Sequence, residues 1–178
     1  GPPEGGGGWG VRNGWLGVES AAGAGAWVLR MPERGRRPGA HSVAQLELFK
    51  SSSKRIANPS VLICVGDGLS ATAVEKHAVR LLTSLNRALG SRYSLMKQLF
   101  IRNARVRIED HLGEILRPDL IGIIVGERPG LATAESLSAY VIYRPTPKSL
   151  EPERTVISNI HRGGIPIAEA CRKTAALI

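Results

Sequence analysis

The stretch Leu120-Ile121-Gly122-Ile123-Ile124-Val125 runs directly into Gly126-Glu127-Arg128-Pro129-Gly130-Leu131, and together they decide the fold. An apolar run that only Gly122 interrupts predicts a strand buried on both faces, as in a parallel sheet. A charged pair in a turn rich in Gly and Pro then ends this strand. Ligands of open α/β sheets bind just outside the carboxyl ends of the strands. We therefore interpret residues 126–131 as a binding loop.

Regular patterns on both sides of this strand give the order of the other elements. The predicted strands are 61–65, 99–108, 120–125, 139–143 and 155–160. Ser70 can cap a long helix with one apolar face, Asp110 can cap a shorter helix, and Pro166 suits the first turn of a last helix. The order β-α-β-α-β, followed by two strands and a helix, predicts an α/β fold. We expect a Rossmann-like, mostly parallel sheet flanked by helices.

The composition changes near residue 40 and divides the chain into two parts. Residues 1–40 hold 12 of the 21 glycines and all three tryptophans. Because no helix or strand period persists there, we expect an irregular Gly-rich N-terminal segment over residues 1–41. Residues 42–178 are long enough to bury a core of their own, so we expect them to form one Rossmann-like domain.

The overall charge of the chain is basic. The 178 residues carry a formal net charge of +9, which admits a solvated surface, an acidic partner or nucleic acid. Scattered charges and an aromatic content of 4% disfavour nucleic acid, because single strands need stacking platforms. No apolar run reaches the ~20 residues that span a bilayer. We expect no nucleic acid and no membrane as partner, and the apolar settings of Cys64 and Cys171 indicate a reducing compartment.

Polar residues follow four of the predicted strands. They are Gly66-Asp67-Gly68-Leu69-Ser70, Glu109-Asp110, Glu127-Arg128 and Ser158-Asn159-Ile160-His161. If the strands are parallel, these loops converge on one edge and form a rim suited to a ligand rich in amides or hydroxyls. Simpler roles remain open, since Asp67 is equally a turn residue and Asp110 more readily a helix cap. A Gly68→Val substitution would damage the loop if Gly68 takes a positive φ.

Familiar catalytic motifs do not fit the predicted elements. No predicted strand is followed by G-x-G-x-x-G, and the chain has no G-x-x-x-x-G-K-S/T and no G-x-S-x-G. His77, His111 and His161 have no metal-ligand partner at a recognisable spacing. We expect no catalytic residue and no metal site in this chain, which is typical of a subunit or a binding domain.

Six short stretches carry a resemblance to one family. They are Asp67-Gly68-Leu69-Ser70, Val106-Arg107-Ile108-Glu109-Asp110, Gly113-Glu114-Ile115-Leu116, Gly126-Glu127-Arg128-Pro129-Gly130-Leu131, Glu135-Ser136-Leu137-Ser138 and Ile157-Ser158-Asn159-Ile160-His161. In this order they resemble the light (small) chain of adenosylcobalamin-dependent ethanolamine ammonia-lyase. The resemblance covers about residues 44–178, and residues 1–40 do not share it.

The resemblance implies a partner, a cofactor and a site. The light chain of this family packs against a TIM-barrel heavy chain in a hetero-oligomer that converts ethanolamine to acetaldehyde and ammonia, with adenosylcobalamin between the two chains. The resemblance also assigns cobalamin contacts to Val106, Glu127 and Val156. Glu127 would accept hydrogen bonds from the amide side chains of the corrin. The implied location is the bacterial cytoplasm, with the interior of a bacterial microcompartment left open.

Two other functions remain as alternatives. The chain could be a stand-alone flavodoxin-like module that binds a nucleotide or another small polar ligand, or a basic adaptor for RNA or acidic proteins. The subunit hypothesis predicts that the chain alone binds cobalamin weakly and catalyses nothing. The adaptor hypothesis predicts binding that falls steeply with salt.

Overall fold

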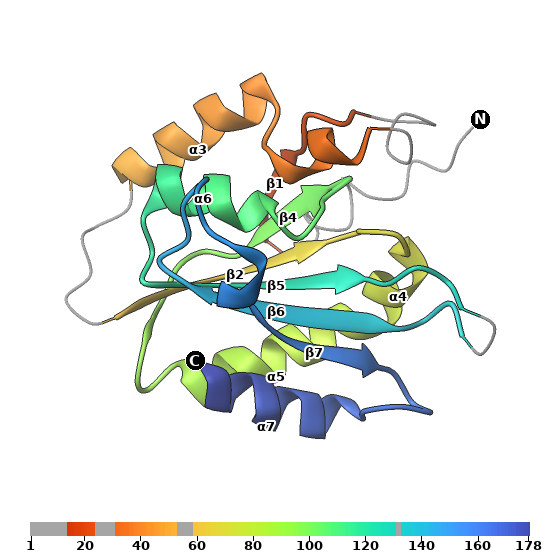
Figure 1. Ribbon diagram of the computed structural model, residues 1–178. Helices are drawn as coiled ribbons and strands as arrows, with labels where there is room; N and C mark the ends of the chain where they lie inside the picture. The colour runs from red at the N-terminus through yellow and green to blue at the C-terminus, as the bar shows by residue number, and fades with distance from the viewer. Residues whose placement is uncertain (1–13, 24–30, 53–58, 131–132) are drawn as a thin grey trace.

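Seven strands form one sheet at the centre of the computed structural model, which describes residues 14–23, 31–52, 59–130 and 133–178 (Figure 1). The strands are β1 (Leu16–Glu19), β2 (Ser60–Gly66), β3 (Ser94–Leu95), β4 (Leu99–Arg102), β5 (Leu120–Gly126), β6 (Leu137–Tyr143) and β7 (Thr155–Ile160). Their order is β1-β4-β2-β5-β6-β7, and the short β3 pairs with β2.

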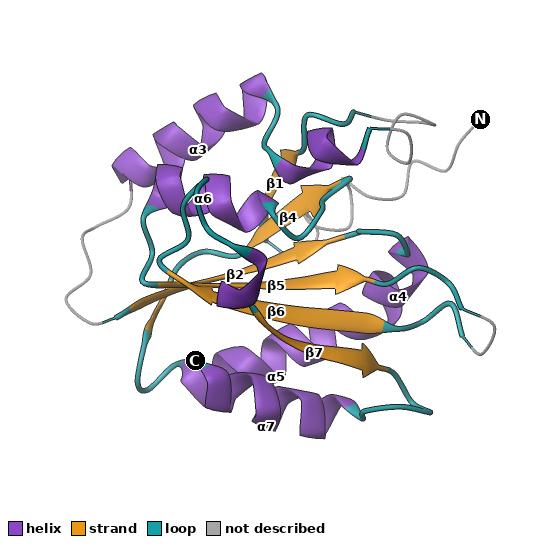
Figure 2. Ribbon diagram, in the orientation of Figure 1, coloured by secondary structure: helices purple, strands orange, loops and turns teal. Residues whose placement is uncertain are grey.

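Helices cover both faces of this sheet. They are η1 (Pro32–Arg36), α3 (Ala40–Ser52), α4 (Ala71–Ala73), the π-helix η2 (Val74–Ala78), α5 (Val79–Leu89), α6 (Ile108–Leu116), η3 (Glu151–Glu153) and α7 (Ile167–Leu177). The helices α3 and α6 lie on one face, and α5 and α7 lie on the other (Figures 1 and 2). The α/β class with a mostly parallel, helix-flanked sheet is therefore confirmed.

The direction of the strands decides which loops meet. All pairs among β1, β2, β3, β4 and β5 are parallel, whereas β6 is antiparallel to both β5 and β7. Two reversals cancel, so β7 runs in the direction of β5. In the register, Gly126 pairs with Leu137, and Leu137 pairs with Ile160. The carboxyl ends of β2, β4, β5 and β7 therefore lie at the same end of the sheet, where the loops that follow these strands meet.

Burial explains why the two central strands are almost entirely apolar. In β2 and β5, alternate residues pack into two separate cores, one under α3 and α6 and one under α5 and α7. Leu62 and Ile123 belong to the first core, and Ile63 and Ile124 belong to the second. Cys64 and Cys171 are both free and buried, which agrees with their apolar settings in the sequence.

The strand predicted at 99–108 is wrong beyond Arg102. The chain leaves the sheet at Asn103, whose φ of 56° is incompatible with an extended strand. Ile108 begins α6, so the alternation of apolar residues near it belongs to a loop and a helix. Asp110 does not cap that helix, because it lies inside the first turn and Arg107 takes the capping position.

The N-terminal segment differs from the sequence expectation. Within residues 1–41, where no strand was expected, Leu16–Glu19 forms β1 and pairs in parallel with β4. The four-residue strand is too short to produce a visible period, and its partner lies about 80 residues away (from Leu16 to Leu99). This part of the segment is an edge of the same sheet as residues 42–178. The glycine run 5–8, Trp9 and Trp27 lie outside the described residues.

Candidate functional site

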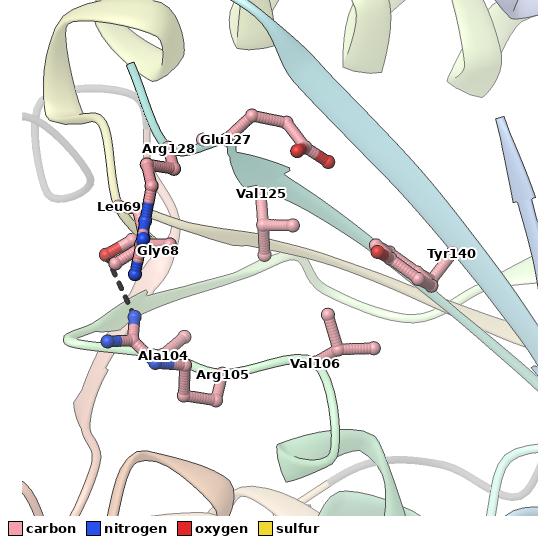
Figure 3. Close-up of a pocket in the computed structure, with 10 residues that line it drawn as sticks. Gly68, Leu69, Ala104, Arg105, Val106, Val125, Glu127, Arg128 and Tyr140 are labelled. Atoms are coloured by element: carbon pink, nitrogen blue, oxygen red, sulfur yellow. Dashed lines mark hydrogen bonds between the residues drawn. The ribbon is translucent and has the colours of Figure 1, made fainter. Parts of the chain in front are cut away.

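A pocket opens where the order of the strands reverses. The strands β4 and β5 both follow β2 in the chain but flank it on opposite sides, and open α/β sheets bind ligands at such a point. The pocket has a volume of about 160 Å³ and is formed by the loops after β2, β4 and β5 together with one side chain of β6 (Figure 3). Its lining residues are Gly68, Leu69, Ala104, Arg105, Val106, Val125, Gly126, Glu127, Arg128 and Tyr140.

The turn after β2 holds the neighbouring loops together. Gly68 has a φ of +58°, as the sequence expectation required, and a Cβ there would lie 2.4 Å from the carbonyl oxygen of Gly126. The same oxygen accepts a hydrogen bond of 2.9 Å from the amide of Leu69. Asp67 accepts a hydrogen bond of 3.3 Å from the amide of Ala104, and burial raises the pKa of its carboxyl group. Asp67 therefore joins the β2 loop to the β4 loop.

A fingerprint that sequence reasoning missed lies in this turn. Residues 66–71 read G-x-G-x-x-A, a variant of the dinucleotide-binding motif in which the second glycine lets the ligand approach the backbone. Here the space beside Gly68 is filled by Gly126. The second glycine serves loop packing, and the motif gives little support to nucleotide binding.

The carboxylate of Glu127 is half-buried and held at the rim of the pocket. The amide of Glu127 donates to the carbonyl of Ser136 over 2.9 Å, and the hydroxyl of Ser138 donates to the carboxylate. The hydroxyl of Ser70, which also caps α4 as expected, donates to the carbonyl of Ala134 over 2.6 Å and fixes the same loop. Leu131 of the predicted binding loop lies outside the described residues.

Two arginines lie at the other end of the pocket (Figure 3). Arg105 donates a hydrogen bond of 3.3 Å to the carbonyl of Gly68. Burial lowers the pKa of Arg105, and the positive charges of Arg128 and Arg36 add to this effect while Asp67 opposes it. The pocket is therefore positive at the arginine end and negative at Glu127.

Tyr140 is a pocket residue that sequence reasoning missed. It projects from the middle of β6, whereas the predictions concentrated on loops after strands. Its register partner across the sheet is Val156 of β7, which is 43% exposed. Burial raises the pKa of Tyr140, and the charge of Glu127 raises it further. The alternation along β6 would have placed Tyr140 on the same face as Ile142.

The residues proposed for the cofactor lie close together. Val106 and Glu127 both line the pocket, and Val156 lies beside Tyr140 on the adjoining strand. Asn159 lies at the same edge of the sheet, where its side chain is 2.7 Å from His161, but it does not line the pocket. Of the four segments predicted to form the rim, the three that follow β2, β5 and β7 therefore lie at this end of the sheet.

Glu109 and Asp110 do not belong to the rim, and this part of the prediction is wrong. Both lie in α6 and are buried against Arg154, which donates to Glu109 over 3.3 Å and also to Asp110. Burial raises the pKa of Glu109 to about 8, although Arg154 acts in the opposite direction. The pairing joins residues more than 40 positions apart and has no local signal in the sequence.

A Glu109→Gln variant is expected to flatten the pH dependence of stability. The folded chain keeps the Glu109 proton up to a pKa of about 8, whereas the unfolded chain loses it near the ordinary value of 4.5. The free energy of unfolding therefore falls as the pH rises between these values, by at most about 1.4 kcal/mol per pH unit. Urea unfolding at several pH values measures this slope. Equal slopes in the variant and the parent chain would contradict the assignment.

Groups that could hold a metal are absent from the residues that the structure describes. No three His, Cys, Asp or Glu side chains there are close enough to share an ion. No helix in the same ranges is both long and apolar enough to cross a bilayer.

Comparison with known proteins gives one family. The family model described as "Ethanolamine ammonia-lyase light chain (EutC)" matches residues 11–178. The match begins well before residue 44 and so corrects the expectation that the N-terminal segment lies outside the family; β1 falls within it.

Curated relatives named "Ethanolamine ammonia-lyase small subunit" match most of the chain. The relative from Lachnoclostridium phytofermentans is 42% identical over 151 residues, which is 84% of this chain and 49% of the relative. The relative from Clostridioides difficile is 41% identical over 84% of this chain and 50% of its own length. The relative from Clostridium perfringens is 43% identical over 83% of this chain and 48% of its own length. The chain therefore spans about half the length of the curated relatives it matches.

Proposed function

Because the chain belongs to the ethanolamine ammonia-lyase light chain family, we propose that it helps to hold adenosylcobalamin against a heavy chain. In this role it is one subunit of a hetero-oligomeric carbon–nitrogen lyase that converts ethanolamine to acetaldehyde and ammonia. The observation that carries the proposal is that Val106 and Glu127 line one pocket at the switch point of the sheet, with Val156 alongside. The proposed location is the bacterial cytoplasm, with a microcompartment left open.

The size of the pocket supports a shared site. Pockets that enclose drug-sized ligands measure about 300–1,000 Å³, and the volume of about 160 Å³ here is smaller. A corrin is larger than such ligands, so this pocket can accept only a side arm or an edge of the ring. The exposed side chain of Val156 extends the apolar surface beyond the pocket. A second chain would have to cover the rest of the cofactor.

The chemistry of the lining residues fits the amide-rich rim of a corrin. The carboxylate of Glu127 can accept hydrogen bonds from amide N–H groups, and the charge strengthens such bonds. Val106 and Val156 can make apolar contacts, and the ring of Tyr140 offers a flat surface between them. Arg105 and Arg128 can donate to amide carbonyls at the other end.

The role of the chain is positioning and exclusion of water. Adenosylcobalamin, when bound, supplies a radical by homolysis of its cobalt–carbon bond. Such a species must be kept from solvent, which a rigid sheet edge with polar tips can help to do. Glu127 is the single carboxylate among the described residues that line the pocket, so no pair for acid–base work is present there. Ethanolamine binding and turnover are therefore assigned to the heavy chain.

A Glu127→Ala variant is expected to weaken cobalamin binding by about tenfold to a hundredfold, the value of one hydrogen bond to a charged group. The fold should survive, because the side chain is only half-buried and alanine keeps the backbone hydrogen bond from residue 127 to Ser136. Equilibrium binding of cobalamin to the complex with a heavy chain measures the effect. Glu47→Ala, at an exposed position of α3, is the matched control. Equal affinity in the Glu127 variant and the parent complex would remove Glu127 from the site.

Reconstitution tests the function as a whole. Co-expression with a heavy chain of the family should give a complex that binds cobalamin and releases ammonia from ethanolamine, while the chain alone does neither efficiently. Tight nucleotide binding by the chain alone, without any association with a heavy chain, would favour the flavodoxin-like alternative instead.

A further inference from the structure

Four ionisable side chains form a largely buried cluster at the start of α6. We define the Arg154 cluster as Arg154, Glu109, Asp110 and Arg107. The side chains of the first three are 2%, 0% and 3% exposed. Arg107 contacts Asp110 over 3.1 Å from the outer side. Arg154 thus reaches two carboxylates, one of which Arg107 also binds.

The cluster connects the two segments that carry the proposed cofactor contacts. Val106 precedes Glu109 by three residues and lies in the loop that leads into α6. Val156 follows Arg154 by two residues, at the start of β7. Arg154 also donates to the carbonyl of Leu150 over 3.4 Å, so the strand and the turn before it are held to the same helix.

The start of β7 has few other constraints on its position. This strand is the last strand of the sheet and pairs with β6 alone among the described strands. Most of its residues are exposed, and its register shifts between Leu137 and Ala139 of β6. Ile160 is buried in the core under α5 and α7 and Ile157 packs against that core, whereas Thr155 and Val156 are exposed. The start of a strand with so little apolar burial has a weakly specified register. The side chain that fixes its start therefore has an effect on where Val156 lies.

Stability alone is a weak reason for this cluster. Buried ion pairs carry a large desolvation cost, and apolar replacements of similar volume are often as stable. Buried charges are better explained where they specify one arrangement among several. Here the specified arrangement is that of α6 relative to β7.

We propose that Arg154 is a positioning residue of the cofactor site, which sets the separation of Val106 and Val156 across Tyr140 by joining α6 to the start of β7. The inference rests on the proposed function, and Arg154 itself does not touch the cofactor.

The test uses the light chain assembled with its heavy chain and hydroxocobalamin as the probe. The double variant Glu109→Gln/Arg154→Met removes both groups of the central pair and leaves Asp110 with Arg107. Arg154→Lys keeps the positive charge but lacks the several N–H donors of the guanidinium group. Arg144→Met is the control, because that arginine pairs with Asp119 at the amino end of β5, away from the pocket and from the start of α6. Affinity, the visible circular dichroism of the bound corrin and the melting temperature are measured for each complex.

The expected result separates position from stability. The double variant should lose less stability than a chain that lacks Arg154 alone, because glutamine leaves no unpaired charge at position 109 and Asp110 keeps Arg107. It should nevertheless bind hydroxocobalamin about tenfold or more weakly and with an altered dichroism spectrum, since loss of supporting contacts has effects of this size. The affinity and spectrum of Arg154→Lys should lie between those of the double variant and the parent complex. Arg144→Met should match the parent complex in both.

Three outcomes would overturn the inference or its premise. A folded double variant with parental affinity and spectrum refutes the positioning role, and so does affinity that follows melting temperature in every variant. If the double variant does not fold, Arg154→Lys decides, because parental affinity and spectrum in that folded variant also refute the role. Failure of the parent complex to bind hydroxocobalamin refutes the proposed function.

Discussion

Gly68→Val is expected to destabilise the chain by about 2–5 kcal/mol. A side chain at a φ of +58° costs about 1–2 kcal/mol, and forcing extra atoms into packed surroundings costs about 1–3 kcal/mol more. The displaced atoms are backbone atoms of Gly126, which cannot rotate away as a side chain would. Urea unfolding measures the loss.

Gly17→Val is the control for this substitution. Gly17 lies in β1, has no heavy atom within 4 Å of a Cβ and has an ordinary φ, so valine should be tolerated there. A Gly68 variant as stable as the Gly17 variant would show that the β2 loop does not need its close contact with Gly126.

Arg154→Met is expected to destabilise the chain by about 3–5 kcal/mol, the range for breaking a buried ion pair. Glu109 and Asp110 each lose a donor that water cannot replace, because both are buried. The cost should be greater at about pH 9 than at about pH 6, since Glu109, with a pKa of about 8, can remain protonated at the lower pH.

Urea unfolding at both pH values measures this difference, with Arg144→Met as the exposed counterpart. A cost that is the same at both pH values would show that Glu109 does not change its charge in this range. A cost no larger than that of Arg144→Met would show that the Arg154 cluster is not buried as described.

The parts of the fold that were predictable have local causes. Continuous apolar runs identify β2 and β5 because strands covered on both faces have no polar side. The Ser70 cap and the glycine at residue 68 follow from the backbone chemistry of a strand–turn–helix connection. The order of these elements brings the loops after β2 and β5 together, whereas Val106 and Glu127 were joined in one site only through the family resemblance.

The parts that were not predictable depend on contacts between distant residues. The strand β1 exists because its backbone pairs with β4, and a four-residue strand leaves no period to detect. The end of β4 was misplaced since Asn103 adopts a positive φ that alternating residues do not indicate. Tyr140 takes its role from its neighbour Val156 on β7, and Arg154 takes its role from Glu109 and Asp110 of α6. No spacing along the chain reports such neighbours.

The outer edge of β7 has a consequence for handling the protein. Along most of this strand the backbone amides and carbonyls on the side away from β6 have no partner strand among the described residues. Uncapped edges of this kind recruit strands from other molecules. Concentrated preparations of the isolated chain are therefore prone to self-association through β7. A lysine introduced on the outer side of this strand would be a rational way to keep the chain monomeric.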